Sequence, residues 1–309
     1  TKLITLATLR GTLANVISHS TCQEVPLMAQ MTQTRPQPAA TQFLGRPGGR
    51  IAYDVSGEGP LVVAVPGMGD LRSAYRAVVP VLVDAGYRVA TMDLRGHGES
   101  DTTFDAYDSP AAGSDIVALV DGLGGGPAVV IGNSMTAGSA VIAAAERPDL
   151  VAGLVLTGPF VREAQAGRLA ELGFRLALLR PWGPRSWNSW YGRLYTGRRP
   201  DDLDEHRARI RENLAQPGRW DAFIQTTRTS HAPAEVRLGD VTTPTLVVMG
   251  ASDPDFGDPA AEASFIGERL SGRVLMVPNA GHYPHAEYPE VVTPEIVRFL
   301  ADEARWVDA

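Results

Sequence analysis

From about residue 42 onward, short apolar runs alternate with amphipathic stretches. Each run is only a few residues long and almost wholly apolar, which is typical of strands buried on both faces of a sheet. A glycine turn at 47–49 between two further extended segments predicts a hairpin ahead of them. The apolar runs occupy residues 61–65, 88–92, 128–131, 154–156, 245–249 and 274–277.

The amphipathic stretches carry apolar residues at helical spacing. We expect helices at 73–84, 109–123, 135–146, 259–270 and 289–304. Buried strands that alternate with such helices predict an α/β fold with a doubly wound, mostly parallel sheet covered on both faces.

The alternation stops at residues 160–237, which are polar, helical in pattern and hold Trp182, Trp187 and Trp190. We therefore predict a helical cap at 160–237, inserted into a core formed by 41–159 and 238–309. The cap holds a small excess of arginine over acidic residues, which a solvated face explains.

The first forty residues differ from the rest, and we expect a leader that is disordered or non-native. They hold the only lysine, Lys2, and the only cysteine, Cys22, and they suggest a functional start near Met28 or Met31. A signal peptide is the alternative, although the apolar stretch is short and broken by threonine. We expect a cytoplasmic protein, with secretion left open by this leader.

Composition narrows the function classes further. The 309 residues have a formal net charge of −7, which argues against nucleic acid as a partner. There is no run of about 18 apolar residues that could span a bilayer, so we expect no membrane partner. No zinc-like spacing and no glycine-rich phosphate loop is present, and we expect neither a metal nor a cofactor.

The strongest chemical signal is Gly132-Asn133-Ser134-Met135-Thr136, which follows an apolar run and opens a helix. A serine on such a sharp turn presents its hydroxyl at the edge of the sheet, which predicts a nucleophile at Ser134. Gly132 is small, as the close approach of strand and helix requires, while Thr136 stands where glycine is usual.

A serine nucleophile needs a base and an orienting acid, each at the end of a later strand. His282 follows the run at 274–277, and Asp253 follows the run at 245–249, with Asp255 as a second candidate. For the oxyanion hole we expect the backbone N–H groups of Met135 and of Met68, in the loop after residues 61–65.

These motifs make the chain resemble the α/β-hydrolase superfamily over residues 42–305. The segment 93–100 is similar to the D-x-R-G-x-G-x-S turn of that family, whereas Pro66 replaces the histidine usual in its oxyanion loop. The Gly-Asn-Ser-Met elbow resembles those of small esterases, carbon–carbon bond hydrolases and cofactor-free perhydrolases. A serine at the elbow disfavours epoxide hydrolases and haloalkane dehalogenases, which use aspartate there.

The resemblance implies a carboxylesterase acting on a small apolar ester. A carbon–carbon hydrolase, a perhydrolase and a slow-turnover ligand receptor are also compatible with it. Substrate walls could come from Trp187, Trp190, Tyr191 and Phe160, although the tryptophans could equally be the cap's own core. We expect His97 to order its turn, and expect His231 and His285 at the surface.

Overall fold

The computed structural model describes residues 40–163 and 168–306. Within them, eight strands form one sheet in the order β1-β2-β4-β3-β5-β6-β7-β8. The pairs β1–β2 and β2–β4 are antiparallel, and every later pair is parallel. The strands are β1 (Gln42–Arg46), β2 (Gly49–Ser56), β3 (Leu61–Val65), β4 (Arg88–Met92), β5 (Ala128–Asn133), β6 (Val151–Thr157), β7 (Thr245–Gly250) and β8 (Arg273–Val277). The predicted α/β fold with a mostly parallel sheet is confirmed.

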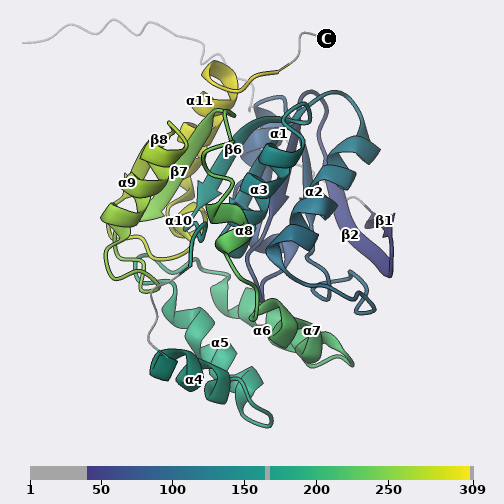
Figure 1. Ribbon diagram of the computed structural model, residues 1–309, viewed down its shortest axis with the longest axis vertical. Coiled ribbons are helices and arrows are strands. Elements are labelled where there is room, and N and C mark those ends of the chain that lie inside the picture. The colour runs from purple at the N-terminus through teal and green to yellow at the C-terminus, as the bar shows by residue number, and fades with distance from the viewer. Residues whose placement is uncertain (1–39, 164–167, 307–309) are drawn as a thin grey trace, which may run out of the picture. The chain divides into compact units, whose positions relative to one another are not determined.

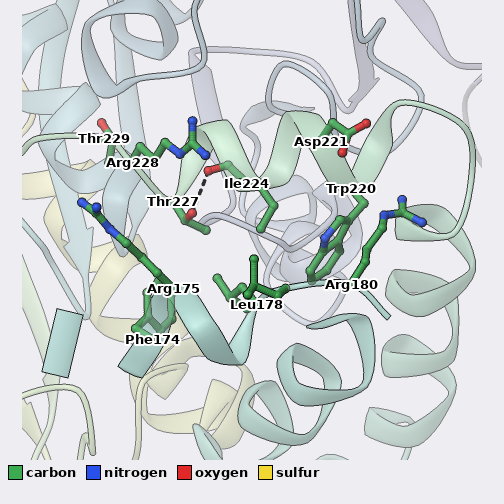
Figure 2. Close-up of a pocket in the computed structure, with 11 residues that line it drawn as sticks. Phe174, Arg175, Leu178, Arg180, Trp220, Asp221, Ile224, Thr227, Arg228 and Thr229 are labelled. Atoms are coloured by element: carbon green, nitrogen blue, oxygen red, sulfur yellow. Dashed lines mark hydrogen bonds between the residues drawn. The ribbon is translucent and has the colours of Figure 1, made fainter. Parts of the chain in front are cut away.

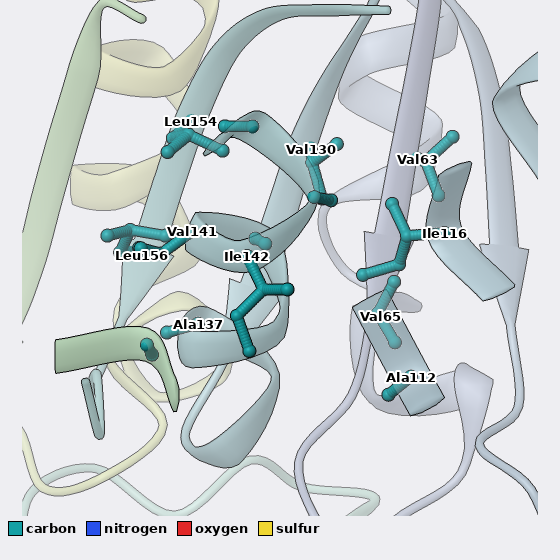
Figure 3. Close-up of a cluster of buried hydrophobic side chains, with 14 of the residues drawn as sticks. Val63, Val65, Ala112, Ile116, Val130, Ala137, Val141, Ile142, Leu154 and Leu156 are labelled. Carbon is teal, nitrogen blue, oxygen red and sulfur yellow. The ribbon is translucent and has the colours of Figure 1, made fainter. Parts of the chain in front are cut away.

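Helices cover both faces of this sheet (Figure 1). In β3, Val63 and Val65 pack in the cluster that contains α2 (Ser109–Leu123), α3 (Met135–Glu146) and α9 (Pro259–Arg269). The alternate residues Val62 and Ala64 pack in a second cluster, with α1 (Val79–Asp84) and α11 (Pro289–Asp302). Side chains alternate between the faces of a strand, so a strand covered on both sides must be apolar throughout. Figure 3 shows the first cluster between the sheet and helices α2 and α3.

The helix expected at 73–84 is wrong as a continuous element. The structure has a 3₁₀ turn, η1 (Arg72–Tyr75), followed by the separate helix α1. Pro80 lies in the first turn of α1, where its missing N–H is harmless, whereas inside a longer helix it would remove a hydrogen bond and clash with the preceding turn.

Between β6 and β7 the chain forms helices instead of strands. They are α4 (Arg168–Ala177), α5 (Gly183–Arg193), α6 (Leu203–Leu214), α7 (Arg219–Thr226) and α8 (Ala232–Glu235). Helices α4 to α7 lie together beyond one end of the strands (Figure 1). Helix α8 packs on α3 instead, since a Cβ on Gly138 would come within 3.3 Å of the Ala234 Cβ. Helix α8 therefore packs on the sheet-covering layer, although it lies within the range 160–237 expected for the cap.

The cap has its own aromatic core. Trp187, Tyr191, Trp220 and Phe223 are buried together, and Tyr283 of the sheet-end loops joins them. No helix in the described part of the chain has both the length and the apolar character needed to cross a bilayer.

Candidate active site

Ser134 occupies the sharp turn between β5 and α3. Its backbone has φ 58° and ψ −125°, a conformation that costs a non-glycine residue free energy and is typical of functional sites. A Cβ on Gly132 would lie 2.5 Å from the Thr136 carbonyl oxygen, so only glycine fits there. The strand–turn–helix geometry is the one that the sequence predicted for a nucleophile.

Thr136, where glycine is usual, is fully buried and hydrogen-bonded. Its hydroxyl accepts a hydrogen bond from the Asn133 N–H at 2.9 Å, and it lies 2.8 Å from the Val65 carbonyl oxygen, to which it donates. The side chain therefore ties the end of β3 to the turn that carries Ser134. The departure from glycine is accommodated because both polar functions of the hydroxyl are satisfied.

His282 and Asp253 form a buried pair at the ends of β8 and β7. The Nδ1 of His282 lies 2.7 Å from Asp253 Oδ2 and 3.7 Å from Asp255 Oδ2. Only the first distance is that of a hydrogen bond, which favours Asp253 over Asp255 as the orienting acid. With Nδ1–H donating to Asp253, Nε2 is left as the acceptor that a general base requires.

The charged groups around His282 favour its protonated form. Burial lowers the pKa of His282, but Asp253 and Asp255 outweigh burial and raise that pKa from 6.5 to about 9. Burial also raises the pKa of Asp255, although His282 opposes this effect. Two carboxylates thus face one imidazole, and one of them makes no hydrogen bond to it.

The elbow and the histidine loop are in contact. Asn133, next to Ser134, donates from Nδ2 to the Thr157 carbonyl oxygen at 3.0 Å and to the His282 carbonyl oxygen at 3.4 Å. Phe160 donates its N–H to the Ser134 carbonyl oxygen at 3.2 Å, and its ring centroid lies 5.8 Å from that of His282. The structure therefore brings the three predicted triad residues to one edge of the sheet.

The loop after β3 lies beside Ser134, as an oxyanion hole requires. A Cβ on Gly67 would come within 2.9 Å of the Ser134 Cβ. The N–H groups of Gly69 and Asp70 donate hydrogen bonds inside the protein. Gly69 donates to His97 Nε2 at 2.9 Å, and Asp70 donates to the Gly67 carbonyl oxygen at 3.3 Å. The Met68 N–H has no partner among the described residues, which agrees with its expected role as a donor to substrate.

His97 does more than order its own turn. Its Nδ1 lies 2.9 Å from the Arg95 carbonyl oxygen, while its Nε2 accepts the Gly69 N–H. Burial lowers the pKa of His97 to about 4, so the ring stays neutral and can accept that bond at ordinary pH. The turn that resembles D-x-R-G-x-G-x-S therefore anchors the loop after β3.

Asp70 joins the loop after β3 to the cap. One of its carboxylate oxygens lies 2.7 Å from His206 Nε2 on α6, and the other accepts the Tyr191 hydroxyl on α5 at 2.8 Å. Tyr191 is fully buried, so it belongs to the cap core and is not a free substrate wall. The contacts of Asp70 with these two partners could not be predicted from sequence spacing, because they join residues 121 and 136 positions apart.

The other three residues suggested to line the substrate site differ in their exposure and contacts. Trp187 is 5% exposed, with its indole Nε1 3.5 Å from the Gly69 carbonyl oxygen, whereas Trp190 is 37% exposed. Phe160 stacks on Phe256 at 4.7 Å and on His231 at 5.5 Å. His231 therefore contributes to the aromatic surroundings of His282 through Phe160.

Sequence reasoning missed two buried groups in α10 (Pro284–Glu287). Glu287 accepts the N–H of Gly281 and the N–H of Gly197, both at 2.8 Å, and burial raises its pKa to about 7. It positions the loop that carries His282. The surface position expected for His285 is wrong, because the ring is fully buried and stacks on Tyr75 at 5.0 Å.

One group of side chains has the composition of a metal site. Ligand atoms of Asp253, Asp255 and His282 lie within 4.8 Å of one another. These include the predicted acid and base, and the imidazole Nδ1 already makes its 2.7 Å bond to Asp253. We interpret the group as an acid–imidazole pair with a second carboxylate, an arrangement that works without an ion.

Comparisons with known proteins found a matching family profile and several similar chains. A sequence profile described as "Alpha/beta hydrolase family" matches residues 62–295. A Mycobacterium tuberculosis protein named as a non-heme bromoperoxidase, BpoC, is 30% identical, covering 81% of this chain and 97% of the relative. The 2-(acetamidomethylene)succinate hydrolase of Mesorhizobium japonicum is 29% identical, covering 82% and 92% respectively. The solved structure of a thermophilic esterase from Thermogutta terrifontis superimposes with a TM-score of 0.66 at 26% identity, over 85% of this chain and 98% of that one.

Proposed function

Because the chain belongs to the alpha/beta hydrolase family, we propose that it hydrolyses carboxylic esters through an acyl-enzyme on Ser134. The observation that carries this proposal is the strained turn of Ser134 in contact with the loop that holds the His282–Asp253 pair. A relative among solved structures is an esterase, which supports the same reaction class.

In this mechanism His282 Nε2 accepts the proton of the Ser134 hydroxyl as the oxygen attacks the ester carbonyl. The N–H groups of Met68 and Met135 stabilise the oxyanion, and the protonated imidazole then gives its proton to the departing alcohol. A water molecule, deprotonated by the same nitrogen, attacks the acyl-enzyme and releases the acid. Asp253 keeps Nδ1 protonated and stabilises the imidazolium.

A second candidate uses the same acyl-enzyme with hydrogen peroxide in place of water. His282 would accept a peroxide proton, the peroxide oxygen would form the new bond to the acyl carbon, and Ser134 would leave with its proton restored, releasing a peracid. The similarity to the protein named as a bromoperoxidase favours this candidate over a carbon–carbon hydrolase or a ligand receptor.

Turnover of chromogenic esters from acetate to octanoate tests the proposal. An ordinary esterase should release nitrophenol at about 1 s⁻¹ or faster. A peroxide titration with a peracid assay measures how the acyl-enzyme divides between water and peroxide. Turnover of a ring-cleavage diketone without ester turnover would make the protein a carbon–carbon hydrolase, and slow turnover of all of them would favour a receptor.

A further inference from the structure

Exposed apolar side chains are concentrated on one part of the cap. Of the twelve large apolar side chains exposed among the described residues, seven lie within residues 169–190. We call these seven the cap-tip surface. They are Leu169, Leu172, Phe174, Leu176, Leu179, Trp182 and Trp190. Soluble monomers rarely gather exposed apolar side chains in this way, and such gatherings mark interaction sites.

The cap-tip surface lies on α4, on the turn after it and on α5, and α4 is the cap helix farthest from the sheet in Figure 1. Leu169 is 85% exposed, and Leu172 and Leu176 are each exposed by about half, at 52% and 51%. These leucines therefore contribute little to the cap's core and have apolar area available for a partner.

Helix α4 is also incompletely packed on its inner side. A hollow of about 630 Å³ separates it from α7, and another of about 470 Å³ separates it from α5. Phe174 and Leu178 line both hollows. Figure 2 shows the first, with Leu178 and Trp220 among its apolar lining residues and Arg180 and Arg228 also lining it.

The same segment is strongly cationic. Residues 168–193 contain five arginines and one glutamate, a net charge of +4 in a chain of net charge −7. Arg180, Arg185 and Arg193 are exposed and form no ion pair with any residue in the described ranges. Most arginines in the rest of the described residues form ion pairs, as Arg76 does with Asp202 at 2.6 Å.

We propose that the cap-tip surface docks on an anionic lipid surface. The leucines and tryptophans enter the headgroup region while the arginines contact lipid phosphates. This is a peripheral contact, which does not require a membrane-spanning segment. The expectation of no membrane partner rested only on the lack of an apolar run long enough to span a bilayer. The docking does not depend on which reaction Ser134 supports.

Charge favours a lipid surface over a second copy of this chain. A symmetric dimer through the cap-tip surface would bring two segments of net charge +4 face to face. Like charges at close range oppose such pairing, whereas an anionic bilayer attracts each exposed arginine.

Co-sedimentation of the full chain with lipid vesicles tests the proposal. Binding to phosphatidylcholine vesicles that contain phosphatidylglycerol should exceed binding to phosphatidylcholine alone, and should weaken as salt is added. The double change Leu172→Asp and Leu176→Asp should abolish it, while Val81→Asp, at a similarly exposed position on α1, should not. Arg180→Gln and Arg185→Gln should each weaken binding about fivefold, whereas Arg269→Gln on α9 should have little effect.

Circular dichroism and hydrolysis of a water-soluble acetate ester should be unchanged in the leucine and arginine variants, which separates loss of docking from loss of folding or of activity. Absence of vesicle binding by the wild type, or equal binding by the leucine variant and the Val81 control, would overturn the proposal. So would lipid-independent dimers in analytical ultracentrifugation that Leu172→Asp and Leu176→Asp abolish, because the surface would then be a self-interface.

Discussion

Two carboxylates face the imidazole of His282, and their roles can be separated. Asp253 makes the 2.7 Å hydrogen bond that fixes the tautomer. Replacing it by asparagine should lower kcat by about 10⁴, the scale of loss when a triad acid is removed. Steady-state kinetics on one ester measure this effect. If Asp255→Asn lowers kcat by this factor and Asp253→Asn remains active, Asp255 and not Asp253 is the orienting acid.

Asp255 should act on the pH dependence instead. The general base works only when unprotonated, and the pKa of His282 is raised to about 9 by Asp253 and Asp255, against the effect of burial. The kcat/KM of the wild type should therefore rise with pH up to that region. Asp255→Asn removes one of the raising charges, so the acid limb should move to lower pH. Lowering the pKa of His282 by one should raise kcat/KM at pH 7 about tenfold, because the unprotonated fraction rises by that factor.

The groups that face His282 come from several elements: Asp253 and Asp255 after β7, with Glu287 and the buried His285 on α10. Asp240→Asn, at an exposed position outside this set, is the control for the pH profile. An unchanged acid limb in Asp255→Asn would show that Asp255 does not influence the imidazole.

At the scale of elements, the two cap tryptophans should behave differently. Trp187 is packed between Phe223 and Gly69, so Trp187→Ala should cost about 3–5 kcal/mol of stability and depress activity on all esters together. Trp190 is 37% exposed on the wall of the hollow beside α4, and Trp190→Ala should cost about 1 kcal/mol or less. Thermal unfolding and an ester chain-length series on both variants measure the contrast, and an equal loss of stability would contradict it.

Elements with strong periodicity were predictable from the sequence. Helix α2 has the predicted bounds, and it begins where Asp108 accepts the Ala111 N–H at 3.0 Å. The helix predicted at 73–84 failed because apolar spacing alone does not register the break imposed by Pro80. The packing of α8 on α3 was not predicted, because a four-residue helix carries too little pattern to show which partner it packs on.

The candidate triad could be proposed from the sequence because each member follows a strand, and parallel strands end at a common edge. The contacts that anchor that edge could not be predicted from the sequence. These contacts depend on how the loops and the cap come together. They join His97 to Gly69, Asp70 to His206, and Glu287 to Gly281. Buried polar groups of this kind carry no periodic signal in the sequence.

At the scale of the whole molecule, the sheet and cap should not need the beginning of the chain. The eight strands of the described residues all lie between Gln42 and Val277. Deleting residues 1–30 should leave the melting temperature and activity nearly unchanged. Deletion through residue 48 is the contrasting variant, because it removes β1 and the packing of Leu44 on the core. Loss of soluble protein in the shorter deletion would contradict this prediction.

Covalent labelling identifies a nucleophilic serine directly, and we expect it to identify Ser134. After reaction with an organophosphonate, mass spectrometry of peptides should find the label on Ser134, with parallel loss of esterase activity. Ser134→Ala should show neither label nor turnover while keeping the circular dichroism of the wild type. Labelling of another serine in the wild type, or persistent labelling and turnover in Ser134→Ala, would show that Ser134 is not the nucleophile.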